Sequence, residues 1–159
     1  MRKTTVFFAV YVVVLQGVFL LLASLREHDA LQKVVVFLSG TIILCIALLC
    51  MKILKRIFRK HRQYKDGTLF IPKDSYAFPS GHATGIATLV TYIFDKNVEI
   101  GIIALCFGAL VVASRVMSHV HDIVDVIGGI VLGVSITLLL IPVIEPMVYH
   151  VISTHMFLS

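Results

Sequence analysis

The feature that most constrains this chain is a series of long apolar segments separated by short polar turns. No charged residue interrupts the segment from Thr4 to Leu25, and the segment from Val34 to Leu54 contains only Lys52. A helix needs roughly 20 apolar residues to cross the hydrocarbon core of a bilayer. In lipid, each span must satisfy its own backbone polar groups, which favours helices. The sequence therefore predicts an all-α fold, a polytopic membrane helical bundle.

The composition supports a membrane environment. Hydrophobic residues make up 58% of the 159 residues and charged residues 14%, whereas soluble domains have roughly 45–50% and about 25%. A soluble domain of this length could not bury so much apolar surface. We expect one membrane-embedded domain over residues 1–159. The three cysteines lie in apolar segments without metal-ligand spacing and are expected to pack as small hydrophobic residues.

About five transmembrane helices are predicted. The first is expected to be retained, because it is long for a signal peptide and no small-residue cleavage site follows it. Pro142 and Pro146 are expected to interrupt the chain after the fifth span, and the tail to form an interfacial helix or an extension of that span. The predicted spans cover residues 4–25, 34–54, 79–94, 98–116 and 121–141.

Two patterns indicate how these spans are arranged. Gly129 and Gly133 have the spacing that lets helix backbones approach closely, and we expect them to pack within the monomer. Five crossings also gather the polar residues that could do chemistry on one side of the membrane, where ionisable groups at helix ends indicate function. These residues are Lys55, Arg62, Ser80, His82, Arg115, His121 and Asp125.

His121 and Asp125 are the strongest catalytic candidates. They are four positions apart at the start of the fifth predicted helix, so their side chains share a face. A carboxylate bonded to one imidazole nitrogen fixes the tautomer and leaves the other nitrogen more basic. The pair has the arrangement of an oriented nucleophile, here a histidine. The alternative is an ion pair on a helix surface.

The segment Pro79-Ser80-Gly81-His82 predicts an anion site. Proline suits the first turn of a helix, and the unpaired N–H groups there attract a phosphate that Ser80 and Gly81 can approach. His82 would then stand beside the phosphate, placed to protonate a leaving oxygen. The alternative is an ordinary helix cap followed by an unrelated histidine.

Three cations could neutralise a phosphate on this face. Arg115 can bind it bidentately, and Lys55 and Arg62, seven positions apart, project from one face if the second helix continues. Phosphoryl transfer needs such neutralisation, by metal or by cations. We expect no metal and no cofactor, because a metal needs converging His, Cys or carboxylate ligands and these cations would repel it.

Three motifs in this order resemble the type 2 phosphatidic acid phosphatase superfamily, which also includes the vanadium haloperoxidases. The family pattern is KxxxxxxRP, then PSGH, then SRxxxxxHxxxD. The first runs from Lys55 to Arg62, with Gln63 in place of the usual proline. The second is intact at 79–82, and the third is intact from Ser114 to Asp125. Membrane members of the family usually have six spans, one more than is predicted here.

The resemblance implies a metal-free phosphatase. His121 would attack phosphorus and form a phosphohistidine, held by Asp125, and His82 would protonate the leaving alcohol before water clears the intermediate. The phosphate would be bound by Lys55, Arg62, Ser80, Gly81 and Arg115. The expected partners are a lipid phosphate and the bilayer, with no nucleic acid.

Three functions follow as hypotheses. The first is hydrolysis of a lipid phosphate monoester or diphosphate, such as phosphatidylglycerophosphate, phosphatidic acid, a polyprenyl diphosphate or a phosphorylated glycolipid. The second passes the phosphate to a lipid or sugar acceptor, and the third is a non-catalytic lipid-binding membrane protein. Family members usually place the site outside the cytoplasm. The excess of basic residues on the site side, 11 of 14, instead favours the cytoplasmic face of the cell membrane.

Overall fold

The computed structural model describes residues 17–18, 20–27, 29–61, 76–117 and 121–157. Within these residues the fold is all-α, as predicted, and the only β pairing is an isolated bridge between His61 and Tyr76. Residues 17–18 and 20–25 are helical and belong to the first predicted span, the rest of which lies outside the described residues. The four helices that follow are α2 (Ala30–Phe58), α3 (Gly81–Lys96), α4 (Val98–Met117) and α5 (Ile123–Phe157).

The helix ends follow from local sequence. α2 begins after Asp29, whose carboxylate accepts a hydrogen bond from the Leu31 N–H at 3.4 Å. It ends at Phe58, and the C-cap residue Arg59 adopts a left-handed conformation with φ 46° that turns the chain out of the helix. Asn97 separates α3 from α4, and its side chain accepts a hydrogen bond from the Ile100 N–H at 2.9 Å.

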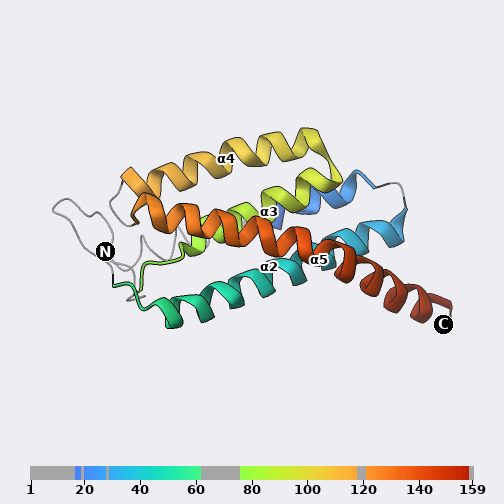
Figure 1. Cartoon of the computed structure of the whole chain (residues 1–159). Coiled ribbons are helices and arrows are strands. Elements are labelled where there is room, and N and C mark those ends of the chain that lie inside the picture. The colour runs from blue at the N-terminus through green and yellow to red at the C-terminus, as the bar shows by residue number, and fades with distance from the viewer. Residues whose placement is uncertain (1–16, 19, 28, 62–75, 118–120, 158–159) are drawn as a thin grey trace, which may run out of the picture.

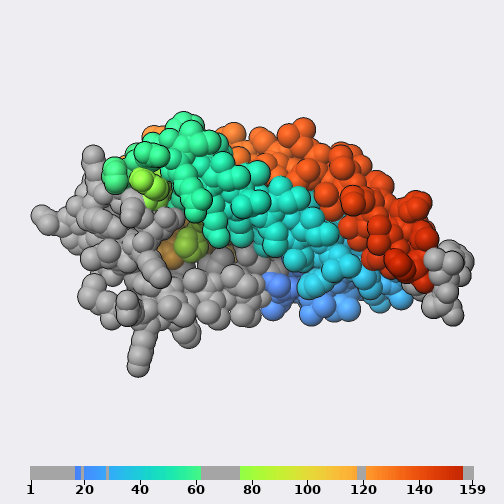
Figure 2. All heavy atoms as spheres, turned by 90° about the horizontal axis from the view of Figure 1, so that it is seen from below, coloured from blue at the N-terminus to red at the C-terminus, as the bar shows by residue number. Residues whose placement is uncertain are grey.

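The helices run alternately up and down, as the predicted parity requires (Figure 1). The end of α2, the starts of α3 and α5 and the end of α4 lie at one end of the bundle (Figure 1). The connection between α3 and α4 and the C-terminal end of α5 lie at the other. Figure 2 shows α2 along one face of the molecule with α5 beside it, in agreement with the extensive contacts between these two helices.

Three of the described helices are long and apolar enough to cross a membrane, namely α2, α4 and α5 as far as His155. Large apolar side chains cover their outer faces, for example Leu110, 68% exposed, and Leu139, 71% exposed. Such surface is stable against lipid and not against water, so the chain is a membrane protein. α3 has 16 residues, about 24 Å, and is shorter than the roughly 30 Å core. It packs centrally, against α2, α4 and α5.

Gly129 and Gly133 pack α5 against α3 within the monomer, as predicted. A Cβ at Gly129 would lie 2.6 Å from the Ser80 carbonyl oxygen, and one at Gly133 would lie 2.5 Å from the Thr84 carbonyl oxygen. Only glycine allows this approach at these two positions. The contact brings the first turns of α3 and α5, which carry most of the predicted site, side by side.

The expectation that Pro142 and Pro146 interrupt the last helix is wrong. Both prolines lie inside α5, which continues to Phe157 and extends past the ends of α3 and α4 (Figure 1). The tail is therefore an extension of the fifth helix, one of the two predicted alternatives. A proline removes a backbone hydrogen bond without ending the helix where neighbouring helices hold the chain in place. Leu140, Ile141 and Ile144 provide such contacts by packing against the apolar core.

A polar cluster, which the sequence analysis did not identify, also holds α5 in the region of the prolines. Glu145 accepts a hydrogen bond from the Tyr92 hydroxyl at 2.7 Å, and the Lys96 ammonium lies 2.6 Å from its other oxygen. The Tyr92 hydroxyl also lies 3.0 Å from the Val36 carbonyl oxygen. The cluster therefore joins α2, α3 and α5 at the end of the bundle opposite the predicted site.

Candidate active site

The start of α3 lies where the sequence predicts an anion site. Ser80 is the N-cap residue, but its side chain does not cap the helix, so the first-turn N–H groups are left without that acceptor. Its hydroxyl is fully buried and has no hydrogen-bond partner among the described residues. Gly81 begins the helix, and a Cβ there would lie 3.0 Å from the Met51 Cε of α2. The segment therefore presents several hydrogen-bond donors at a positive helix end.

The first turn of α5 is joined directly to this segment. The Ser80 N–H donates to the Asp125 carbonyl oxygen at 2.9 Å. Asp125 lies in the first turn of α5, and its side-chain oxygen accepts a hydrogen bond from the Asp122 N–H at 3.2 Å. This backbone contact and the approach at Gly129 together determine where Asp125 stands relative to His82.

His121 and Asp125 form the predicted pair. The Nδ1 atom of His121 lies 3.7 Å from Oδ2 of Asp125, and both side chains are buried, with 2% and 1% exposed. This distance is typical of an ion pair and is longer than a hydrogen bond. The orientation directs Nδ1 of His121 at the carboxylate.

Lys60 completes the surroundings of Asp125 and is a site residue that the sequence analysis missed. Its ammonium lies 2.6 Å from Oδ1 of Asp125 and 3.3 Å from Oδ2 of Asp122. Burial alone would lower the pKa of Lys60, but the hydrogen bonds and charges of these two carboxylates outweigh it and raise the pKa above its ordinary value. The buried carboxylate of Asp125 therefore faces His121 on one side and is neutralised by Lys60.

A short antiparallel pairing positions Lys60. The Ala77 N–H donates to the Lys60 carbonyl oxygen at 2.7 Å, and His61 pairs with Tyr76. This pairing follows the left-handed turn at Arg59. Lys60 lies in a run of basic residues, and nothing in the motif spacing distinguishes it from its neighbours, so only the fold could identify it.

Arg115 and His82 meet at the same end of the bundle. The Nη2 atom of Arg115 lies 3.4 Å from Nε2 of His82. A guanidinium can only donate, so in a hydrogen bond between these two atoms Nε2 accepts. The Arg115 carbonyl oxygen accepts a hydrogen bond from the His121 N–H at 3.4 Å. Arg115 therefore connects the two histidines, one through its side chain and one through its backbone.

Of the other two predicted cations, Lys55 is buried near the end of α2, and its ammonium donates to the Tyr76 carbonyl oxygen at 3.2 Å. Arg62 lies outside the described residues. The structure thus gathers seven of the eight predicted site residues at one end of the bundle, and adds Lys60. They are Lys55, Ser80, Gly81, His82, Arg115, His121 and Asp125.

This arrangement can bind an anion and move protons. It combines a helix start, buried cations and two histidines, one of which faces a carboxylate. In the described part of the chain, no three His, Cys, Asp or Glu side chains come together as a metal site would require. Cations and helix N–H groups are the donors that suit an anion such as a phosphate.

Comparison with known proteins agrees with the motifs. A family model described as the PAP2 superfamily matches residues 35–147, more than half of the chain. The matched region runs from α2 into α5 and contains every site residue predicted from the sequence. No solved structure matches the chain.

Proposed function

The chain belongs to the PAP2 superfamily, whose members are generally phosphatases, and on this basis we propose that it is a membrane enzyme that hydrolyses a lipid phosphate. The substrate is a phosphate monoester or diphosphate of a lipid, such as phosphatidylglycerophosphate, phosphatidic acid, a polyprenyl diphosphate or a phosphorylated glycolipid. The observation that carries the proposal is the meeting of His121, Asp125 and Arg115 with the start of α3 at one end of an apolar bundle.

In the proposed first step, Nε2 of His121 attacks phosphorus. The bond between phosphorus and the leaving oxygen breaks as the N–P bond forms, and His82 gives its proton to that oxygen. Asp125 faces Nδ1 of His121 at 3.7 Å and stabilises the positive charge that develops on the ring. A water molecule then attacks phosphorus and gives a proton to His82; the new O–P bond forms as the N–P bond breaks, the electron pair returns to Nε2 of His121, and inorganic phosphate leaves.

Cations and helix N–H groups supply the charge stabilisation in this proposal. Lys55, Arg62, Arg115, Ser80 and Gly81 bind the phosphate oxygens. A bound phosphate would compete with Nε2 of His82 for the Arg115 guanidinium, now 3.4 Å away, and would leave that nitrogen able to carry the proton for the leaving group. Lys60 acts as a positioning residue, because it touches Asp125 and Asp122.

Phosphate release in a chelator tests the proposed chemistry. Purified protein in detergent is given a panel of lipid phosphates with excess EDTA, and inorganic phosphate is measured. We expect release at an unchanged rate, because protein cations and N–H groups take the place of a metal. Loss of release in EDTA, restored by a divalent metal, would contradict metal-free catalysis. Phosphate that appears only on an added alcohol or sugar would instead indicate a transferase.

We further propose that the protein resides in the cell membrane with its site on the cytoplasmic face. Apart from three proposed phosphate ligands, Lys55, Arg62 and Arg115, the site side carries eight basic residues against three on the other side. Such an excess marks cytoplasmic segments. The alternation of the described helices supports the grouping of these residues, because it puts the ends of α2 and α4 on one side (Figure 1).

Protease access in intact cells tests this orientation. A tag on the C-terminus should be cleaved by external protease, because α5 ends on the side opposite the site. A tag on the N-terminus should be protected until the membrane is opened. The reverse pattern would place the site outside the cytoplasm.

A further inference from the structure

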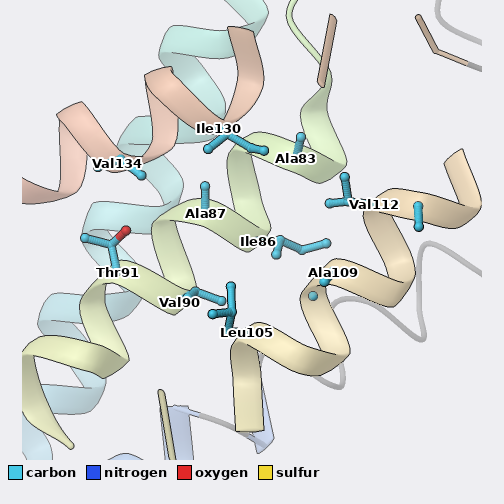
Figure 3. Close-up of a pocket in the computed structure, with 12 residues that line it drawn as sticks. Ala83, Ile86, Ala87, Val90, Thr91, Leu105, Ala109, Val112, Ile130 and Val134 are labelled. Atoms are coloured by element: carbon cyan, nitrogen blue, oxygen red, sulfur yellow. The ribbon is translucent and has the colours of Figure 1, made fainter. Parts of the chain in front are cut away.

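An apolar groove of about 370 Å³ lies between α3, α4 and α5 and is lined by short or branched apolar side chains (Figure 3). On α3 and on α4 the lining positions recur every three or four residues, so each helix turns one face to the groove. Among the described residues that line it, Thr91 is the single polar one. Representative lining residues are Ala83, Ala87 and Thr91 of α3, Leu105 and Ala109 of α4, and Ile130 of α5.

The groove exists because two helices pack against a third and make few contacts with each other. α4 and α5 both pack against α3, but they barely contact each other. Small residues keep α4 close to the floor, since a Cβ at Gly108 would lie 2.5 Å from the Ile86 Cγ2. Leu105 and Ile130 at the edges are 49% and 39% exposed. A molecule in the surrounding bilayer could therefore enter from the side.

One end of the groove adjoins the candidate active site. Ala83 follows His82 directly, and Ala113, another lining residue, is two positions before Arg115. From Ala83 to Thr91 the groove follows α3 for eight residues, about 12 Å, away from the phosphate-binding end. Half of a hydrocarbon core is about 15 Å, so the groove has nearly the depth of one leaflet.

We propose that this groove binds one hydrocarbon chain of the substrate while its phosphate occupies the site beside His82. This inference rests on the proposed function, and it adds the position of the hydrocarbon chain of the substrate. A volume of about 370 Å³ is near the lower limit for ligand sites, so the groove accepts one chain and leaves a second chain in the bilayer. Ala109, part of one wall, is then a specificity residue, since its size decides how far a chain can reach.

The test compares monoalkyl phosphates that differ only in chain length. The ratio of kcat/KM for octyl phosphate to that for butyl phosphate is measured with wild type, Ala109→Phe and the matched control Cys106→Phe. Cys106 is an exposed residue of α4 that does not line the groove. We expect Ala109→Phe to lower the ratio about tenfold or more, because each excluded methylene loses packing contacts, and Cys106→Phe to leave it within about twofold.

The results separate this proposal from the proposed function. If both substrates are hydrolysed and Ala109→Phe does not change the kcat/KM ratio of octyl to butyl phosphate, the groove does not bind the chain. The proposed phosphatase activity would still hold. No hydrolysis of either substrate by wild type would overturn the phosphatase. Whether a chain occupies the groove is then tested by photolabelling with an octylphosphonate that carries a diazirine in the middle of its chain. The phosphonate cannot be hydrolysed. Labelling of α3 and α4 that Ala109→Phe suppresses would support the groove, and labelling unaffected by it would overturn it.

Discussion

We expect phosphate release to fall by about four or more orders of magnitude when His121 is replaced by Asn, the scale of loss that follows removal of a covalent nucleophile. Asn keeps much of the imidazole volume and a polar atom near Asp125, so the bundle should remain folded. It cannot form the N–P bond. The measurement is inorganic phosphate released from a lipid phosphate in detergent, with the melting temperature as the check on folding.

A trapping experiment adds a direct readout of the same step. Wild type quenched during turnover should carry an acid-labile phosphoryl group on the peptide that contains His121, and His121→Asn should carry none. His150→Asn is the matched control, because His150 is an exposed histidine of α5 in the half of the helix remote from the site. Turnover by the His121 variant above about one thousandth of wild type would contradict a phosphohistidine at this position.

Asp125→Asn should lower kcat by about 10³–10⁴, the scale found when an Asp that orients a catalytic histidine loses its charge. The substitution removes the negative charge 3.7 Å from Nδ1 of His121 and leaves the Lys60 ammonium without its closest partner, now at 2.6 Å. Asp122→Asn is the control, since Asp122 also contacts Lys60 but is half exposed, at 52%. Its effect should stay within about tenfold. Equal effects at both positions would contradict the assignment.

A double-mutant cycle separates the role of Lys60 from general stability. If Lys60 acts only by positioning Asp125, Lys60→Met lowers kcat in wild type and has little further effect in the Asp125→Asn background. Full additivity of the two losses would show that Lys60 acts on something other than Asp125. Lys60→Arg should recover part of the activity, because it restores the charge beside the carboxylate.

Much of this site could be predicted from order along the chain. Asp125 follows His121 by four positions, the spacing of one helical turn. α5 begins only at Ile123, so His121 precedes the helix instead of lying on it, but its Nδ1 still lies 3.7 Å from Oδ2 of Asp125. Proline, serine and glycine before His82 predicted a helix start, and α3 begins at Gly81. The parity of the spans then brought both segments to one end of the bundle. Each of these inferences needs only helix periodicity and the length of a membrane crossing.

Other features depended on contacts between segments far apart in the sequence. Lys60 reaches Asp125 only because the chain turns at Arg59 and pairs with Ala77. α5 continues through Pro142 and Pro146 because other helices hold it, in part through Glu145. The proline rule describes an isolated helix, and the loss of one hydrogen bond is small beside the packing that these helices gain.

The sequence by itself thus determined the class of fold, the family and the end of the bundle at which most of the candidate site residues lie. The reason is that apolar length, helix periodicity and motif order are local properties that survive without knowledge of packing. Only the tertiary structure decided the second partner of Asp125, the continuous last helix and the groove between α4 and α5. Each of these depends on contacts between segments far apart in the chain: the pairing of Lys60 with Ala77, the packing of α5 against the apolar core, and the close approach of helices at small residues such as Gly108.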